Sequence, residues 1–141
     1  MIVLDTNVVS AMMRSDVDPL VVAWLDGQAA ESIWTTTVTV FEIRFGLELL
    51  APSRRRRQLE EAFIRSIDED FEGRVLAFDD EAARAAAIRA ASRQKAGKTI
   101  DFRDLEIAGI VASRRATLAT RNTRHFEGLE IELVDPWKEG R

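Results

Sequence analysis

The stretch that decides the fold is MIVLDTNVV, residues Met1 to Val9. Residues 2–4, IVL, form a short continuous apolar run, which is typical of a strand that is buried on both faces. Asp5 follows this run at once, and Thr6 and Asn7 are residue types that favour a helix start. The stretch therefore predicts a buried strand that passes directly into a helix, with an acid at the junction.

Asp5 has two explanations. A carboxylate at the end of a buried strand costs free energy unless it has partners, and these could be the N–H groups of the helix start or a ligand. In open parallel sheets, ligands bind at the carboxyl ends of the strands. This stretch alone leaves capping and function equally open, so the decision depends on whether other acids follow strands further along the chain.

Composition limits the class of protein. At 141 residues, the chain can form one domain with a hydrophobic core and is too short for two, so we predict a single domain over residues 1–141. No apolar run approaches the roughly 20 residues of a membrane span, and the N-terminus lacks the pattern of a signal peptide. There is no cysteine, which excludes disulfides and thiolate metal sites and fits a cytoplasmic location.

Histidine content and charge exclude further kinds of site. His125 is the only histidine, so a histidine-rich zinc centre cannot form within one chain. The formal net charge of -4 argues against broad adhesion to nucleic acid, which needs a basic surface. This charge does not exclude a nuclease, because carboxylates that bind a divalent metal ion make a positive centre of their own.

Patterns typical of strands alternate with patterns typical of helices along the chain. After the first strand, further strands are predicted at residues 32–36, 74–78, 116–120 and 131–134. This alternation predicts an α/β fold with a mostly parallel central sheet of four to five strands flanked by helices. Gly46 lies inside the helix that follows the second strand, where it predicts a close contact with another helix.

Glu42 also has two explanations. Thr39 and Glu42 have the spacing of a capping box, in which a threonine is followed three residues later by a glutamate in the first helical turn. The same position lies just past the end of the second predicted strand, where a second acid would meet Asp5 if the two strands are neighbours. The sequence leaves capping and function open.

Asp101 and Asp104 precede a segment that is apolar nearly all round from Leu105 onward, which predicts a buried helix. Asp101 is the better candidate for the N-cap, and this leaves Asp104 available for a site. Residues 79–81 are three adjacent acids on an exposed helix start, and we interpret them as partners of the helix dipole rather than as catalytic groups.

Asn122 lies in the polar loop that follows the fourth predicted strand. Four polar side chains at strand ends or helix starts could therefore converge: Asp5, Glu42, Asp104 and Asn122. Three carboxylates without histidine or cysteine suit Mg²⁺ or Mn²⁺ rather than zinc. With such an ion bound, the cluster is suited to hydrolysis of a phosphodiester bond, because the ion activates a water molecule and stabilises charge on the phosphate.

The motifs of this chain, taken in order, resemble a known family. They are IVLDTNV at the start, TxxE with IxxG over residues 39–46, D-x-x-IA from Asp104, LATRN over residues 118–122, and the terminal pair Pro136-Trp137. Together they span essentially the whole chain. In this order and spacing they resemble a PIN-domain ribonuclease toxin of a type II toxin-antitoxin system, of the VapC type and close to the FitB-like branch.

The resemblance implies a PIN-like three-layer sandwich and an endoribonuclease that depends on Mg²⁺ or Mn²⁺. It implies that Asp5 and Asp104 are the principal metal ligands and that Glu42 is a ligand or positions the attacking water. Thr6 and Asn7 would be supporting polar groups near the metal. Many relatives have a fourth acid where this chain has Asn122, which offers a neutral oxygen but no charge and so does not favour tight binding of a second metal ion.

The resemblance also implies partners. These are an RNA substrate, a cognate VapB-like antitoxin protein, operator DNA bound only indirectly through that antitoxin, and a second copy of the chain in a homodimer, with no membrane. Our candidates for the antitoxin contact lie around the early helices: Trp24, Leu25, Phe45 and Leu49. The alternative is that these four are ordinary core residues.

Two other classes of function stay open at this stage. A DNA nuclease or a phosphatase could use the same ions on the same type of fold. A binding module with a degenerate site is also possible, with Asn122 as the first sign of lost activity. We interpret His125 as a surface residue rather than an RNA contact, and the arginines 54–57 as a solvated helix face rather than a phosphate-binding patch.

Overall fold

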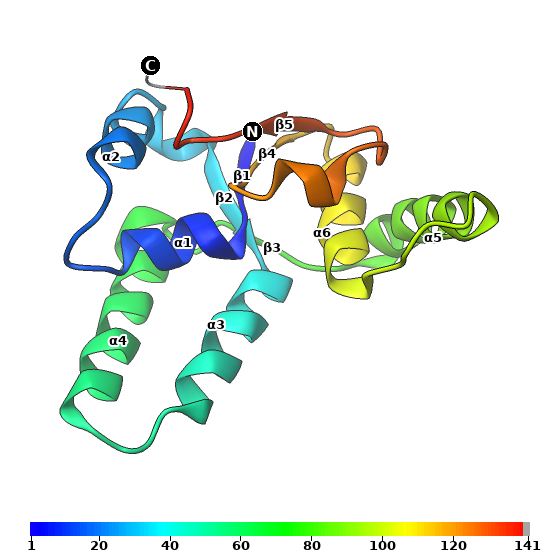
Figure 1. The fold of residues 1–141 in the computed structure, drawn as a ribbon. Coiled ribbons are helices and arrows are strands. Elements are labelled where there is room, and N and C mark those ends of the chain that lie inside the picture. Colours follow the sequence, from blue (N-terminus) through cyan, green and yellow to red (C-terminus); the bar gives the residue numbers. More distant parts are fainter. Residues whose placement is uncertain (140–141) are drawn as a thin grey trace.

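The computed structural model describes residues 1–139, and within them five strands form one central sheet between two groups of helices (Figure 1). The strands are β1 (Ile2–Leu4), β2 (Ile33–Thr36), β3 (Val75–Leu76), β4 (Thr117–Ala119) and β5 (Glu132–Val134). Their order in the sheet is β3-β2-β1-β4-β5, and every pair of neighbours is parallel. The predicted α/β fold is confirmed, with a sheet that is wholly rather than mostly parallel.

Helices cover both faces of this sheet. They are α1 (Thr6–Met12), α2 (Pro19–Asp26), α3 (Thr37–Leu49), α4 (Arg54–Arg65), α5 (Asp80–Lys95) and α6 (Phe102–Ser113). Shorter helical turns are η1 (Ala30–Ser32), η2 (Ser66–Asp70) and η3 (Thr123–Phe126). Helices α1 to α4 lie on one side of the sheet and α5 and α6 on the other (Figure 1). None of the helices within residues 1–139 is both long and apolar enough to span a membrane.

Strand β1 explains why the first residues decide the fold. It pairs with β2 on one side and β4 on the other, so it is a central strand. Val3 and Leu4 are fully buried, and they belong to different hydrophobic cores because successive side chains of a strand point to opposite faces. Val3 packs in the core that contains α6, and Leu4 packs in the core that contains α1 and α3.

The start of α3 differs from the predicted capping box. The helix begins at Thr37, and its N-cap is Thr36, whose Oγ1 accepts a hydrogen bond from the Thr39 N–H at 3.1 Å. Thr39 therefore lies inside the helix, and Glu42 lies in the second turn rather than the first. The capping explanation of Glu42 is wrong, since a second-turn side chain does not serve as the third residue of a capping box.

The close contact between helices occurs at Gly109 rather than at Gly46. A Cβ atom on Gly109 of α6 would lie 2.4 Å from the carbonyl oxygen of Ala82 and 2.8 Å from the Cβ of Ala86, both on α5. Glycine is therefore required where these two helices meet. Among residues 1–139, a Cβ atom on Gly46 would meet no atom within 4 Å, so Gly46 makes no such contact with another helix of this chain.

Candidate active site

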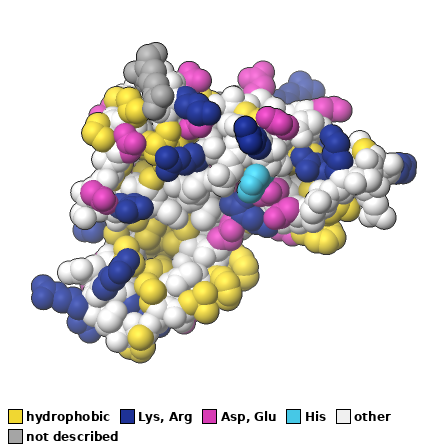
Figure 2. Space-filling view, in the orientation of Figure 1, with side chains coloured by type: hydrophobic (Ala, Val, Ile, Leu, Met, Phe, Trp, Pro, Cys, Tyr) yellow, Lys and Arg dark blue, Asp and Glu magenta, His cyan; other side chains and the backbone are white. Residues whose placement is uncertain are grey.

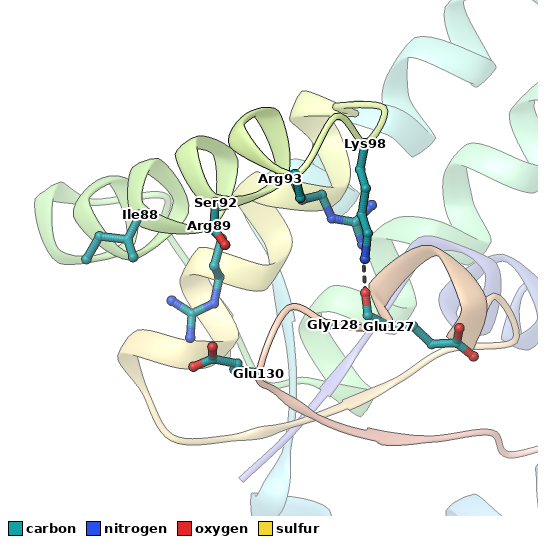
Figure 3. Close-up of a pocket in the computed structure, with 9 residues that line it drawn as sticks. Ile88, Arg89, Ser92, Arg93, Lys98, Glu127, Gly128 and Glu130 are labelled. Atoms are coloured by element: carbon teal, nitrogen blue, oxygen red, sulfur yellow. Dashed lines mark hydrogen bonds between the residues drawn. The ribbon is translucent and has the colours of Figure 1, made fainter.

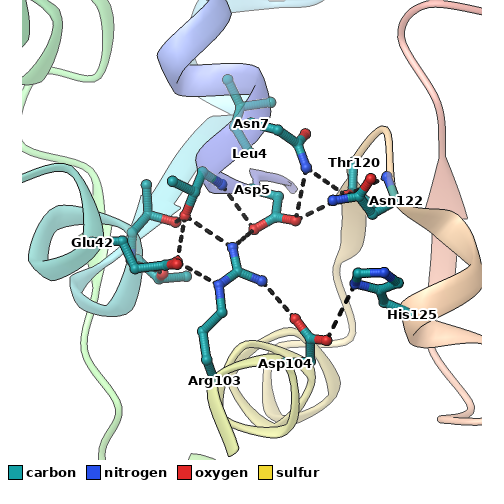
Figure 4. A network of polar contacts seen from close by, with 12 residues as sticks. Leu4, Asp5, Asn7, Glu42, Arg103, Asp104, Thr120, Asn122 and His125 are labelled. Atoms are coloured by element: carbon teal, nitrogen blue, oxygen red, sulfur yellow. Dashed lines mark hydrogen bonds and ion pairs between the residues drawn. The ribbon is translucent and has the colours of Figure 1, made fainter. Parts of the chain in front are cut away.

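Asp5, Glu42 and Asp104 converge at the carboxyl end of the sheet (Figure 4). Asp5 follows β1 directly, while the other two acids come from α3 and α6. The exposed fraction of the side chain is 0% for Asp5, 9% for Asp104 and 29% for Glu42. The structure thus brings together three acids from three separate parts of the chain, two of them buried.

The guanidinium group of Arg103 lies between these three acids (Figure 4). Its Nε donates a hydrogen bond to Glu42 Oε1 at 2.5 Å. Its Nη1 donates to Asp104 Oδ1 at 2.6 Å, and its Nη2 donates to Asp5 Oδ1 at 2.7 Å. One cation therefore bridges three carboxylates and offsets part of their negative charge, which reduces the repulsion that opposes their convergence.

Neutral donors complete the environment of Asp5 and Glu42. Asp5 Oδ1 accepts from the Thr6 N–H at 2.8 Å, so Asp5 caps α1 and is also a member of the acid cluster. Its Oδ2 accepts from Thr120 Oγ1 at 2.8 Å and from Asn7 Nδ2 at 3.4 Å. Glu42 Oε1 accepts from Thr6 Oγ1 at 2.6 Å. These bonds orient both carboxylates before any ligand arrives.

Asp104 lies in the first turn of α6. The predicted N-cap is confirmed, because Asp101 Oδ1 accepts from the Asp104 N–H at 3.0 Å. Burial raises the pKa of the Asp104 carboxyl, the hydrogen bond from Arg103 opposes this rise, and the charge of Asp101 adds to it. His125 Nδ1 lies 3.5 Å from Asp104 Oδ2 and also favours the ionised carboxylate. Burial thus raises the pKa of Asp104, and Arg103 and His125 offset part of this rise.

Arg103 stays positively charged in this position. Burial by itself lowers the pKa of the guanidinium, but the charge of Asp5 and the hydrogen bond and charge of Glu42 outweigh burial and raise it above its ordinary value. The side chain of Arg103 is still 29% exposed. Arg103 is therefore a permanent cation at the mouth of the cluster rather than a group sealed inside the core.

The three carboxylates are suited to bind a divalent cation, although the guanidinium group of Arg103 lies between them in the structure. Carboxylate oxygens are the ligands that Mg²⁺ and Mn²⁺ prefer. Within residues 1–139, no three acidic, histidine or cysteine side chains stand close enough together to hold a metal ion as they are arranged. Arg103 lies among the three acids and separates them, so the same oxygens could converge on a smaller ion if the guanidinium withdrew.

Asn122 joins this network through its backbone. Its N–H donates to Thr120 Oγ1 at 3.1 Å, and Thr120 Oγ1 in turn donates to Asp5. Neither Thr120 nor Arg103 was among the residues predicted for the site. Thr120 directly follows β4, as Asp5 follows β1, so the same pattern could have found it. The sequence held no comparable signal for Arg103 beyond its place between two acids at a helix start.

A separate pocket of mixed charge, lined by Glu127 and Glu130 as well as by basic residues, lies away from the acid cluster. It has a volume of about 140 Å³ and lies between α5 and the segment before β5, with Arg89, Arg93 and Lys98 in its wall (Figure 3). Arg89 donates to the carbonyl of Leu129 at 2.7 Å. Arg93 donates to the carbonyls of His125 and Glu127 at 3.2 and 2.9 Å. These two arginines therefore fasten a loop to α5.

An apolar groove of about 290 Å³ opens beside the cluster between α1, α3 and α4. Thr6 and Glu42 line it together with Met13, Ile43, Leu47, Leu50 and Leu59. Figure 2 shows hydrophobic side chains gathered in the region of α3 and α4. Of the four predicted antitoxin residues, Phe45 and Leu49 are exposed on α3, whereas Trp24 and Leu25 are partly buried against the core. The four therefore differ in accessibility.

Known proteins are similar to this chain along nearly all its length. A protein-family model of the PIN domain matches residues 2–130. The VapC ribonuclease Y4jK of Sinorhizobium fredii is 36% identical over 138 residues, which cover 98% of this chain and 99% of that protein. Toxin FitB of Neisseria gonorrhoeae is 36% identical over 97% of this chain and 99% of its own length.

Solved structures agree with this similarity. The crystal structure of FitAcB from Neisseria gonorrhoeae superimposes with a TM-score of 0.88 at 36% identity, over 98% of this chain and 99% of that chain. The structure of FitAB bound to an IR36 DNA fragment superimposes with a TM-score of 0.87, over 97% of this chain and 96% of that chain.

Proposed function

This chain belongs to the PIN-domain family of VapC-type ribonuclease toxins, and from that premise we propose that Asp5, Glu42 and Asp104 bind a divalent metal ion and cut RNA there. The observation that carries the proposal is the convergence of three carboxylates from three elements on one cationic group. Asp5 and Asp104 are the principal ligands of Mg²⁺, with Mn²⁺ as a possible substitute. The substrate is RNA, which the protein cuts at this site in the cytoplasm.

When bound, the metal ion lowers the pKa of a water molecule and offsets negative charge on the phosphate. The chain contributes orientation. Asp5 is held by Thr6 and Thr120, so its oxygens need little rearrangement to serve as ligands. Glu42 is the most exposed of the three acids and is anchored by Thr6, a position suited to accept a proton from the attacking water.

Asn122 has a supporting role in this proposal. Its backbone N–H orients Thr120, which bonds to Asp5. A neutral carboxamide adds no charge to the site, so the three carboxylates hold one ion tightly rather than two. His125 lies beside Asp104 at the exposed edge of the cluster, and a contact between His125 and RNA stays the less favoured interpretation.

The partners follow from the same family membership. A cognate VapB-like antitoxin protein is proposed to cover the acid cluster and the neighbouring apolar groove, with Phe45 and Leu49 as accessible contacts and Trp24 and Leu25 as more buried ones. Operator DNA is bound only through the antitoxin, in keeping with the net charge of -4 on this chain. Assembly as a homodimer remains a prediction.

Cleavage of a mixed substrate panel tests the function. The panel contains tRNA, structured RNA and single-stranded DNA, incubated with antitoxin-free protein in Mg²⁺, Mn²⁺ or EDTA. Asp5→Asn keeps the shape of the side chain and removes its charge. Asp79→Asn is the matched control, because Asp79 also caps a helix, accepting from the Ala82 N–H at 2.9 Å, but contributes no contact to the acid cluster.

The expected result is metal-dependent cutting of RNA by the wild type and by Asp79→Asn, with none by Asp5→Asn or in EDTA. Equal cutting by the two asparagine variants would contradict the proposed role of Asp5. Faster cutting of DNA than of RNA would favour a DNA nuclease. Folded wild-type protein that cuts nothing would favour a binding module.

A further inference from the structure

We propose that Arg103 occupies the metal site as a built-in competitor and, once the metal ion displaces it, becomes the residue that contacts the RNA phosphate. This inference rests on the proposed function and adds to it a substrate-binding residue that shares ligands with the ion. It concerns the free enzyme before metal and RNA bind, and the same enzyme afterwards.

The competition follows from shared oxygen atoms. The three arms of the Arg103 guanidinium end on Glu42 Oε1, Asp104 Oδ1 and Asp5 Oδ1, one oxygen of each carboxylate proposed as a metal ligand. A guanidinium and a divalent ion cannot both lie among these three oxygens, since each occupies the centre of the cluster. Binding of the metal ion therefore requires Arg103 to leave.

The structure also explains how Arg103, as a competitor of the metal ion, stabilises the metal-free fold. Asp5 is fully buried and Asp104 nearly so, and buried carboxylates without a counterion are strongly unfavourable. Arg103 supplies that counterion within the same chain. The cluster is therefore already assembled in the metal-free protein, and the ion meets oriented ligands instead of having to gather them.

The way out for Arg103 lies towards solvent. Its backbone is in the first turn of α6, directly before Asp104, and its side chain is partly exposed. The side-chain bonds of its guanidinium go to the acid cluster and to Thr6 Oγ1 at 3.0 Å. When the ion takes over these acids, those contacts are lost together, and the side chain can turn outward without disturbing the core.

A displaced Arg103 remains beside the ion, because it is adjacent in sequence to the ligand Asp104. A phosphodiester that approaches the ion presents further anionic oxygens at the same place. The planar guanidinium can donate two parallel hydrogen bonds to a phosphate group. The same charge that offsets part of the carboxylate charge in the free enzyme thus offsets phosphate charge in the complex, and RNA favours the displaced position.

Metal affinity provides the first test, measured by calorimetric titration of Mn²⁺ into metal-free protein without RNA. Arg103→Met removes the cation while keeping a long side chain. We expect Arg103→Met to bind Mn²⁺ about tenfold more tightly than the wild type or better, because the ion no longer displaces charged hydrogen bonds. Arg84→Met is the matched control, since Arg84 lies on the exposed face of α5 and pairs with the exposed Asp80 there.

RNA affinity provides the second test. Binding of a labelled oligoribonucleotide is measured with Ca²⁺ in place of Mg²⁺ to slow cleavage. We expect metal-loaded Arg103→Met to bind RNA about tenfold more weakly than the wild type, although it holds the metal more tightly. Arg103→Lys keeps one point charge and is expected to recover part of this RNA affinity. Arg84→Met is expected to match the wild type.

A measurement on the wild type covers the case in which Arg103→Met fails to fold. The Nε–Hε signal of Arg103 is followed by nuclear magnetic resonance in labelled protein and assigned with Arg103→Lys. In EDTA this proton is expected to exchange slowly with water because of its bond to Glu42. Saturating Mg²⁺ is expected to speed its exchange.

The outcomes separate this inference from the proposed function. Tight metal binding and RNA cutting by the wild type, with Arg103 still protected or with no gain in affinity for Arg103→Met, would overturn the inference alone. Failure of both proteins to bind Mn²⁺ would overturn both proposals. Opposite changes in metal and RNA affinity for Arg103→Met would support the inference, because loss of a merely structural residue would weaken both.

Discussion

Helices α3 and α6 supply two acids to the same guanidinium, yet they are built differently. Helix α6 is buried along most of its length, and Gly109 brings it into close contact with α5. Helix α3 is buried on one side only, and its outer side exposes Phe41, Phe45 and Leu49. The rings of Phe41 and Phe45 stack there with centroids 6.1 Å apart.

The difference shows how one site can combine a buried and an accessible carboxylate. Asp104 is buried because its helix is buried, and burial raises its pKa. Glu42 projects from a helix with a free face and borders the apolar groove that opens beside the cluster. We therefore expect α6 to determine where the metal ion lies and α3 to be the helix through which a partner protein can reach the site.

Removing the carboxylates of Asp104 and Glu42 one at a time should give the largest effects, and these should be unequal losses in the rate of RNA cleavage. We expect Asp104→Asn to lower the cleavage rate about a thousandfold, because it removes the buried carboxylate proposed as a metal ligand, and Glu42→Gln to lower it about tenfold to a hundredfold. Single-turnover RNA cleavage in Mg²⁺ measures both. Glu48→Gln on the exposed side of α3 is the control and should keep full activity. A greater loss for Glu42→Gln would reverse the assigned roles.

Filling the close contact of α6 should destabilise the fold. In Gly109→Ala the added Cβ would collide with the Ala82 carbonyl and with Ala86, so the two helices must separate. We expect the free energy of unfolding to fall by about 1–3 kcal/mol, as for other overpacked cores. Urea denaturation in EDTA measures the change. An unchanged midpoint would mean that α5 and α6 are free to move apart.

The same replacement of glycine by alanine on α3 should raise, rather than lower, the free energy of unfolding. Gly46→Ala adds a methyl group where no neighbouring atom lies within 4 Å. Alanine favours a helix over glycine by about 1 kcal/mol, so we expect the free energy of unfolding to rise by about that amount. The same urea denaturation is the measurement. A loss of stability would show that a contact absent from this structure, such as one with a second copy of the chain, depends on the bare glycine.

The pH dependence of stability should show the smallest effect. The folded-state pKa of Asp104 is raised, so its contribution to stability is fully present below its unfolded pKa of about 3.9 and is lost as the pH rises through the folded value. The wild type, compared with Asp104→Asn in EDTA, should therefore become less stable as the pH rises above about 4. Urea denaturation at several pH values measures this difference. A difference that changes in the opposite direction would mean that Arg103 outweighs burial.

The local features of this chain could be predicted from the sequence. A continuous apolar run at residues 2–4 has few stable environments other than the centre of a sheet, and Asp5 and Asp101 cap helices for reasons that lie within a few residues of each. The buried character of α6 follows from its own composition. The order of strands and helices was also predictable, because the pattern that indicates each element lies within that element's own residues.

Tertiary structure alone decided the rest. Threonines 35–37 and 39 all suit the start of α3, and in the fold Thr35 and Thr36 pair with β3, so that the helix begins after them with Thr36 as its cap. Gly46 and Gly109 look alike in sequence, because a close contact depends on another helix. Arg103 reaches Asp5 across 98 residues of chain. The sequence by itself determined which residues were suited to caps, strands and ligands, whereas the partners of Arg103 depended on packing that only the folded chain brings about.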